Sequence, residues 1–322
     1  MEQFPNISII IPAYNEAESL PELCSWIGQE LDSSSHSYEV IIVDDGSSDK
    51  TWETIKSLSD ESPKVKGYRF NRNYGKSAAL NTGFRHSKGE VIITMDADLQ
   101  DSPAEIPELV RMIEEGNDLV SGWKQKRHDP ISKTIPSRFF NYVTRKLSGI
   151  NLHDFNCGLK AYRKDVVKNI QVYGEMHRYI PLLAKWEGYT KITEKVVEHR
   201  ARKYGETKFG LERFIYGFLD LLSVLFVTKF KKRPMHFFGS WGIFYFIMGL
   251  LITLWLLGQK VYYNWFLHEN VRQVTDQPLF FLALVAVVIG AQLFLVGFLA
   301  ELVTKTSGKK NDYVVSERSN AE

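Results

Sequence analysis

The first two hundred residues alternate short apolar runs with longer amphipathic stretches. Five runs rich in β-branched residues each end in polar or turn-forming residues; they are ISIIIP, EVIIVDD, KVKGYRF, EVIITMDAD and DLVSGW, at 7–12, 39–45, 64–70, 90–98 and 118–123. Apolar strands that alternate with helices are typical of a mainly parallel sheet with helices on both faces. We therefore predict an α/β domain whose ligands bind beyond the carboxyl ends of the strands.

One helix has a clear start in the sequence. Ser102 is placed to cap it, Pro103 suits the first helical position, and Glu105 completes a capping box. Apolar residues then recur at helical spacing, and we expect them to face the core. They are Ile106, Leu109, Val110 and Ile113.

The C-terminal third contains two apolar runs without a charged residue, at 237–257 and 279–300. Each is as long as the ~20 residues that a helix needs to cross a bilayer. The alternative is a pair of buried helices in a soluble core, and we favour a membrane hairpin. Basic residues cluster before the first run and after the second, at 229–233 and 305–310. The positive-inside rule therefore places both termini in the cytoplasm.

The segment 208–234 has apolar residues at helical spacing and ends in basic residues. This pattern indicates an amphipathic helix on the membrane surface. A helix packed on the soluble domain or on another subunit is the alternative. We thus divide the chain into a cytosolic domain at 1–207, the juxtamembrane helix at 208–234, a two-helix hairpin at 235–304 and a cytosolic tail at 305–322. We expect the last dozen residues to be disordered.

The composition narrows the functional classes. Forty Lys and Arg against 38 Asp and Glu leave a net charge of +2, which argues against a nucleic-acid partner. Two cysteines cannot form a disulfide framework, which favours a reducing compartment. The sequence lacks G-x-G-x-x-G and a complete P-loop, so neither a dinucleotide oxidoreductase nor a P-loop enzyme is indicated.

The strongest chemical motif is DADLQ at 96–100, at the end of an apolar strand. Side chains alternate in an extended chain, so Asp96, Asp98 and Gln100 share a face and can converge on one point. Two adjacent carboxylates repel each other, and Mg²⁺ or Mn²⁺ relieves that repulsion. A polar turn in which Asp101 and Ser102 cap the next helix is the alternative.

Two further strand ends carry polar motifs. Asp44 and Asp45 end the second strand, and an acid at this place accepts hydrogen bonds from a base or ribose in nucleotide-binding sheets. The first strand ends in PAYNE, which adds an aromatic face and polar groups at the same edge. Lys76 opens a helix in NRNYGKSAA, where it either faces a nucleotide or belongs to a solvated cap.

These motifs together resemble the family-two glycosyltransferases of the polyprenyl-phosphate type, which include bactoprenol glucosyltransferases and dolichol-phosphate mannosyltransferases. The resemblance covers nearly the whole chain and rests, in order, on PAYNEA, VDDGSSD, NRNYGKSAAL, DADLQD, HDFNCGLKAYR and RKYGETK, followed by the two apolar runs. Processive polysaccharide synthases carry a Q-x-x-R-W motif and more spans, and this sequence has neither. The resemblance implies a Rossmann-like nucleotide-sugar domain of the GT-A type, with a mainly parallel sheet, and an inverting transfer.

The resemblance also implies roles for individual residues. Asp98 and Asp154 would be the catalytic residues, with Asp154 near the anomeric carbon and acting either as a base or only in orienting the substrate. Arg202 and Lys208 would bind the lipid phosphate. The metal would be held by Asp96, Asp98 and Gln100. The nucleotide sugar would be bound by Pro12, Tyr14, Asn15, Glu16, Asp44, Asp45, Lys76, Asp96, Lys124 and Arg138. Relatives often have arginine where this chain has Lys124.

The expected reaction transfers a sugar, glucose from UDP-glucose in the first instance, to undecaprenyl phosphate or another polyprenyl phosphate. It would occur at the cytosolic face of a bacterial inner membrane, and the resemblance implies a homo-oligomer that packs through the membrane region. One alternative keeps the fold but uses GDP-mannose, a UDP-amino sugar or a non-lipid acceptor. An inert membrane scaffold that binds nucleotide sugar is the alternative of another class.

Overall fold

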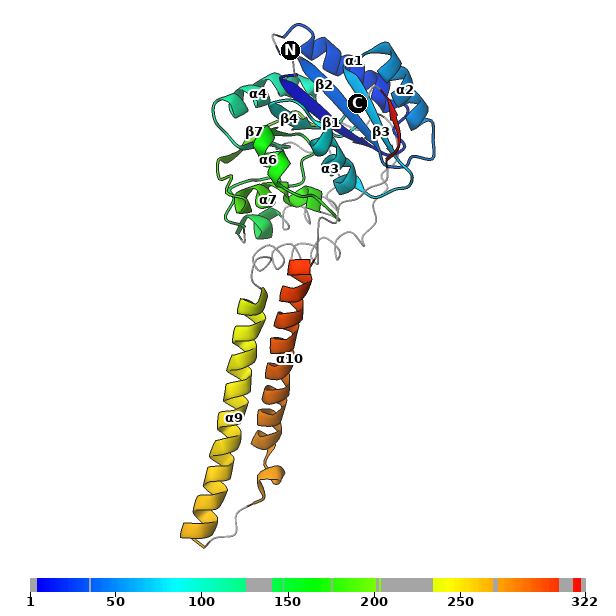
Figure 1. Cartoon of the computed structure of the whole chain (residues 1–322). Helices are drawn as coiled ribbons and strands as arrows, with labels where there is room; N and C mark the ends of the chain where they lie inside the picture. The colour runs from blue at the N-terminus through cyan, green and yellow to red at the C-terminus, as the bar shows by residue number, and fades with distance from the viewer. Residues whose placement is uncertain are drawn as a thin grey trace. The chain divides into compact units, whose positions relative to one another are not determined.

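One mixed sheet organises the N-terminal part of the chain (Figure 1). The computed structural model describes residues 5–34, 36–125, 141–146, 148–174, 176–200, 203, 234–268, 272–306 and 315–319. Within these ranges the sheet has eight strands in the order β7-β5-β6-β4-β1-β2-β3-β8. The predicted amphipathic helix at 208–234 lies outside the described residues, apart from Pro234.

The five strands predicted from the sequence are confirmed. They are β1 (Ile7–Ala13), β2 (Tyr38–Asp44), β3 (Val65–Phe70), β4 (Val91–Thr94) and β5 (Leu119–Trp123). Strands β1 to β4 are parallel to one another, as expected. Three further short strands were not predicted from the sequence: β6 (Lys160–Arg163), β7 (Ile192–Val196) and β8 (Val315–Ser319). Strand β6 lies antiparallel between β4 and β5.

Helices cover both faces of the sheet and bury two apolar clusters against it. The first face carries α1 (Ser19–Leu31), α2 (Thr51–Glu61) and α4 (Ile106–Glu114), the last preceded by the short helix η1 (Pro103–Glu105). The second face carries α3 (Lys76–His86), α6 (Lys164–Asn169), η2 (Met176–Tyr179) and α7 (Ile180–Trp186). Burial of these two clusters supplies the main driving force for folding.

The start of α4 differs from the prediction. Ser102 makes no side-chain hydrogen bond to the helix, and a 3-10 turn precedes α4. The carboxylate of Glu105 instead accepts a hydrogen bond from the Glu198 amide at 3.1 Å and pairs with Lys195. The predicted capping box was therefore wrong, because the Glu105 carboxylate binds the Glu198 amide and Lys195 instead of the start of the helix. The predicted buried face is confirmed, since Ile106, Leu109, Val110 and Ile113 are all buried.

The register of the parallel strands brings three strand ends to one edge. Ala13 at the end of β1 lies opposite Asp44 at the end of β2. On the other side of β1, the Met95 amide donates to the Ile10 carbonyl at 3.1 Å, one residue beyond β4. The PAYNE, DDGSS and DADLQ loops therefore start side by side, at the edge where ligands bind in such sheets.

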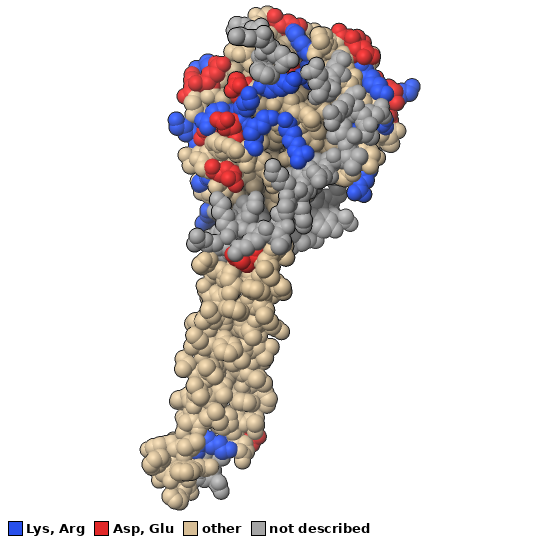
Figure 2. Space-filling model, in the orientation of Figure 1, with Lys and Arg blue, Asp and Glu red and all other residues tan. Residues whose placement is uncertain are grey.

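The two apolar runs form helices α9 (Pro234–Phe266) and α10 (Pro278–Thr306), joined through the short helix η3 (Val274–Asp276). Both helices are long and apolar enough to cross a membrane, and charged side chains are scarce on their visible surface (Figure 2). They pack closely, because a Cβ on Gly249 would lie 2.5 Å from the Ala283 carbonyl oxygen and one on Gly290 would lie 2.5 Å from the Phe246 amide nitrogen. Small residues at such contacts are typical of membrane helix pairs.

The C-terminal tail contains the strand β8, so the expectation of disorder was wrong for 315–319. Strand β8 pairs antiparallel with β3, with Gly67 opposite Ser319 and Phe70 opposite Val315. This pairing covers the β3 edge, whose backbone groups would otherwise be open to another chain. The polar sequence VSERS has no apolar alternation, which is why the sequence alone did not indicate a strand.

We predict that a chain ending at Lys310 exchanges the amide hydrogens of β3 faster than the full chain does. Removing β8 leaves the outward-facing backbone groups of β3 without partners, and local opening then needs less free energy. Hydrogen–deuterium exchange with mass spectrometry on peptides that cover 65–70 measures this. Exchange at 7–13, in the sheet interior, should remain unchanged; equal protection of β3 in both chains would contradict the pairing.

Candidate active site

The loops after β1 and β2 are held together by hydrogen bonds. The Asn15 amide donates to Ser47 Oγ at 2.9 Å, and the Ser48 amide donates to Asn15 Oδ1 at 2.9 Å. Asn15 has a φ of 55°, a left-handed conformation that a non-glycine residue adopts at some energetic cost. Tyr14 beside it is 38% exposed. The predicted nucleotide-binding residues of the first loop thus lie at an open, ordered edge.

Asp45 fixes the loop that leads into α3. Its carboxylate accepts hydrogen bonds from the amides of Tyr74 at 2.7 Å and Gly75 at 2.9 Å. Burial raises the pKa of Asp45 to about 6, although these hydrogen bonds oppose the rise. The next residue must be glycine, because Gly46 has a φ of +70° and a Cβ there would lie 2.4 Å from the Arg72 backbone.

The Asp44 side chain points into the interior of the protein. It is fully buried, accepts a hydrogen bond from the Ser47 amide at 2.9 Å and lies 3.4 Å from Arg69 Nε. Burial raises its pKa. In the described structure this acid holds its own loop, and Asp45 next to it holds the following one.

The DADLQ segment carries the carboxylates predicted to bind metal. Asp96 forms an ion pair with Lys76 at the start of α3. Burial acts to raise the pKa of Asp96, but Lys76 and nearby lysines outweigh it and lower the pKa. Asp98 is buried and accepts a hydrogen bond from the Gln100 amide at 3.2 Å. Leu99 between them has a φ of 59°, a second strained residue at this edge.

The donor set of this segment fits a hard divalent cation. Asp96 and Asp98 supply carboxylate oxygens and Gln100 an amide oxygen, the ligands that Mg²⁺ and Mn²⁺ accept. Among the described residues, no three acidic, histidine or cysteine side chains gather around one point. A metal here would therefore complete its shell with substrate oxygens and water, as Mg²⁺ commonly does. The Lys76 ammonium already shows that Asp96 attracts a cation.

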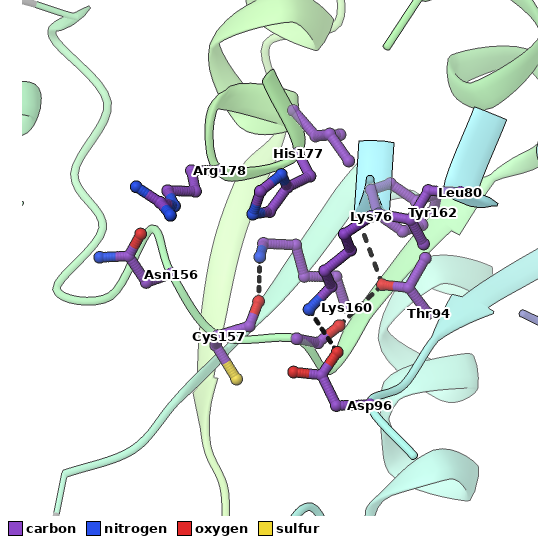
Figure 3. A pocket seen from close by; sticks show the side chains of 12 residues that line it. Lys76, Leu80, Thr94, Asp96, Asn156, Cys157, Lys160, Tyr162, His177 and Arg178 are labelled. Atoms are coloured by element: carbon purple, nitrogen blue, oxygen red, sulfur yellow. Dashed lines mark hydrogen bonds and ion pairs between the residues drawn. The ribbon is translucent and has the colours of Figure 1, made fainter. Parts of the chain in front are cut away.

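The DFNCG loop, which precedes β6, approaches Asp96 (Figure 3). A Cβ on Gly158 would lie 2.5 Å from the Asp96 carboxylate, so a larger residue there would displace the Asp96 side chain. Asp154 is 1% exposed and accepts a hydrogen bond from the Asn156 amide at 3.0 Å. The Ser121 hydroxyl donates to the Asp154 carbonyl at 3.3 Å. The structure thus brings the glycine of this loop against Asp96, with Asp154 four residues before it.

A small pocket opens between this loop, α3 and η2 (Figure 3). Lys76, Asp96 and Lys160 lie on its walls with His177 and Arg178. Lys160, His177 and Arg178 were not among the residues predicted from the sequence. A charged residue inside the short strand KAYR was the available signal for Lys160, but that strand was itself missed.

Lys124, expected to contact phosphate, is paired within the protein. Its ammonium lies 2.7 Å from the fully buried carboxylate of Asp101. Asp101 also forms an isolated bridge with His199. Lys124 thus joins the end of β5 to the loop after DADLQ. Three other candidates, Arg138, Arg202 and Lys208, lie outside the described residues.

Comparison with known proteins identifies the family. The sequence model of "Glycosyl transferase family 2" matches residues 8–171. The chain is 36% identical over 304 residues to "Dodecaprenyl-phosphate galacturonate synthase" of Rhizobium johnstonii, covering 93% of this chain and 88% of the relative. It is 36% identical over 301 residues to "Undecaprenyl-phosphate 4-deoxy-4-formamido-L-arabinose transferase" of Shewanella sediminis, covering 92% and 86%.

Solved structures share the fold at lower identity. Glucosyl-3-phosphoglycerate synthase from Mycobacterium tuberculosis, in complex with Mn²⁺ and UDP-glucose, superposes with a TM-score of 0.54 at 20% identity over 70% of this chain and 79% of that chain. A mannosyltransferase from Pyrobaculum calidifontis, in complex with GDP-Man and Mn²⁺, gives a TM-score of 0.51 at 18% identity over 96% of this chain and 78% of that chain. The predicted GT-A fold is confirmed.

The family match agrees with the resemblance seen in the motifs of the chain, and so do the alignments with curated relatives, which cover nearly the whole chain. The chain is a glycosyltransferase that belongs to glycosyl transferase family 2, in its polyprenyl-phosphate type.

Proposed function

We propose that this enzyme transfers a sugar from a nucleoside diphosphate sugar to a polyprenyl phosphate, with a divalent cation bound at Asp96 and Asp98. The observation that carries the proposal is the grouping of the PAYNE, DDGSS, DADLQ and DFNCG loops at one sheet edge. The names of the curated relatives, which act on dodecaprenyl and undecaprenyl phosphate, support the lipid acceptor.

Asp96, Asp98 and Gln100 would hold the cation, which when bound neutralises charge on the diphosphate of the donor. Mn²⁺ accompanies a nucleotide sugar in two solved structures of this fold. Lys76 has a connected role in this scheme: it pairs with Asp96 in the described structure. When a cation takes that carboxylate, the Lys76 ammonium would become available to the diphosphate, and we propose this nucleotide-facing role for Lys76 over the solvated cap.

The acceptor needs little help to become a nucleophile. A phosphate monoester has a second pKa near ~6, so most of it is doubly ionised at cytoplasmic pH. The remaining tasks are to bring two anions together and to stabilise the leaving diphosphate. Asp154 is buried, and its carboxylate is engaged by the Asn156 amide. We infer that Asp154 orients its loop beneath the sugar rather than removing a proton.

Two features of the donor edge support a nucleotide. Tyr14 offers an exposed ring beside the strained Asn15, and the Asp45 carboxylate lies between that loop and α3. UDP-glucose stays a prediction. The curated relatives name galacturonate and a formamido-arabinose, so a uronic acid or an amino-sugar donor is an equally supported choice. GDP-mannose is a further candidate donor, because a solved structure of this fold contains GDP-Man.

The membrane arrangement has its own support. Helices α9 and α10 expose large apolar side chains along their length, among them Leu251, Trp255 and Leu282, and lipid or a second copy would cover them. Strand β8 follows α10 in the chain yet belongs to the sheet of the catalytic domain. If α9 and α10 cross a bilayer, a chain that leaves the sheet after β7 and returns to it at β8 would cross an even number of times. This favours an inner-membrane hairpin with both termini in the cytoplasm, and we propose a homo-oligomer.

We predict that Asp98→Ala loses transfer by about 10²–10³-fold or more, the loss typical when a charge-stabilising group is removed from an active site. Asp154→Asn should retain part of the activity, because the acceptor is already ionised. The assay follows labelled sugar from a panel of nucleotide sugars into an organic-extractable, acid-labile product with undecaprenyl phosphate and Mg²⁺ or Mn²⁺. Full activity of Asp98→Ala would refute the metal assignment.

The contact between Gly158 and Asp96 gives a second prediction. Gly158→Ala should lower turnover by roughly 10²-fold, since displacement by about 1 Å at reacting groups can cost that much. Gly258→Ala in α9 is the matched control, because a Cβ there would meet no atom within 4 Å. Both variants should keep their thermal unfolding midpoints within a few degrees. Unchanged turnover in Gly158→Ala would show that catalysis does not depend on the position of the Asp96 carboxylate.

The raised pKa of Asp45 predicts a pH dependence of donor binding. As pH falls from 7 to 5 the carboxylate takes up a proton, with the midpoint near its pKa of about 6, and it loses acceptor capacity toward Tyr74 and Gly75. The affinity for a nucleotide sugar should therefore fall across this range. Protonation of Asp45 should not lower the free energy of unfolding. The pKa of Asp45 is higher in the folded than in the unfolded state, so protonation favours the folded state. Calorimetry on the wild type and Asp45→Asn, in which the inflection should vanish, measures this; an inflection that persists in Asp45→Asn would contradict it.

A further inference from the structure

Lys160 is a buried cation for which the fold supplies little compensation. It lies on β6 and is 3% exposed. Its ammonium donates to the Cys157 carbonyl oxygen, which is its only hydrogen-bond partner among the described residues. An ammonium has three donors, and burial of a charge without an opposite charge in contact is costly. Burial accordingly lowers the pKa of Lys160, against the attraction of Asp154 and Asp96 nearby.

Other lysines of the same domain show how the fold satisfies an ammonium. Lys76 pairs with Asp96, and Lys124 pairs with Asp101. Lys168 donates to the carbonyl oxygens of Phe84, Arg85 and Ser87, which end helix α3. Among the described residues, Lys160 has neither a carboxylate in contact nor more than one carbonyl, that of Cys157. The difference points to an anionic partner that is not part of the protein.

The pocket around Lys160 carries an excess of positive charge. Its lining includes Lys76, Lys160 and Arg178 but only one carboxylate, that of Asp96. Lys160 shares this lining with His177, Arg178 and Asn156 (Figure 3). Lys76 is already paired with Asp96, whereas Lys160 has no ion pair among the described residues.

Two further groups in the lining are suited to an oxygen-rich ligand. Burial lowers the pKa of His177 well below its usual value, so the ring is neutral. Ser77 Oγ accepts a hydrogen bond from the His177 amide at 3.0 Å and lies 3.1 Å from Nδ1. Asn156 Oδ1 is buried without a hydrogen-bond partner among the described residues.

We propose that Lys160 and Arg178, with His177 and Asn156, form a subsite for an oxyanion of a substrate. The inference rests on the proposed transferase function for the identity of the ligand but not for the anion site itself. Two substrates present this chemistry: a donor whose sugar carries a carboxylate, and the phosphate of the lipid acceptor. Asn156 Oδ1 would accept a hydrogen bond from a substrate hydroxyl next to that anion.

A binding experiment tests the subsite independently of turnover. Inorganic phosphate should raise the thermal unfolding midpoint of the detergent-solubilised full chain, and Lys160→Met should abolish that shift. Without phosphate, Lys160→Met should unfold at the same or a higher temperature, since an apolar side chain replaces an unpaired buried charge. Lys168→Met, which removes a lysine whose donors are already used, should keep the phosphate shift, and Arg178→Gln should reduce it. A shift of equal size in wild type and Lys160→Met would overturn the proposal.

Steady-state kinetics then distinguish the two sources. If the anion belongs to the donor, the wild type should prefer a UDP-hexuronic acid to the matching UDP-hexose, and Lys160→Met should lose about ten- to a hundredfold of that preference, the range expected for a lost hydrogen bond to a charged group. If it belongs to the acceptor, KM for undecaprenyl phosphate should rise by the same factor with donor preference unchanged. Unaltered donor preference and acceptor KM would refute the subsite, whereas absence of transfer in wild type with every donor would count against the proposed function alone.

Discussion

Charge neutralisation at the carboxyl ends of β1, β2 and β4 is the constraint on which the rest of the structure depends. Three parallel strands place acidic residues at one edge, where Asp45 and Asp98 are buried and Asp96 is half-buried. Like charges so close repel unless cations or hydrogen-bond donors are supplied. The fold supplies backbone amides to Asp45 and an ammonium to Asp96. A nucleoside diphosphate with its cation would therefore meet carboxylates and an ammonium that are already held in place by charge neutralisation.

This constraint accounts for the unusual backbone at the site. Asn15 and Leu99 adopt left-handed conformations at the ends of β1 and of the DADLQ turn. Gly46 approaches the Arg72 backbone so closely that no Cβ fits, and Gly158 lies so close to the Asp96 carboxylate that a Cβ would displace it. Strain and close approach of this kind persist only where the surroundings hold them. At this edge they bring four loops into one site, which the strands alone could not do.

The sequence predicted the parts of this site whose signals are local. The strands β1 to β5 are apolar runs with clear ends, and DADLQ follows one of them, so both strands and acids could be placed by pattern. Strands β6 and β7 are short and partly charged, and β8 is polar; their pairing depends on neighbours far away in the chain. Lys160 was missed for the same reason, because a lysine in KAYR becomes unusual only when the sheet buries it. The pairing of Lys124 with Asp101 likewise needed the fold.

The central claim is that a divalent cation at Asp96 and Asp98 binds the diphosphate of the donor. The most direct measurement is calorimetric titration of UDP into the detergent-solubilised full chain, with Mn²⁺ and then with EDTA. The account predicts clear binding with Mn²⁺ in the wild type and its loss on chelation of the metal. Equal affinity for UDP in Mn²⁺ and in EDTA would contradict the account.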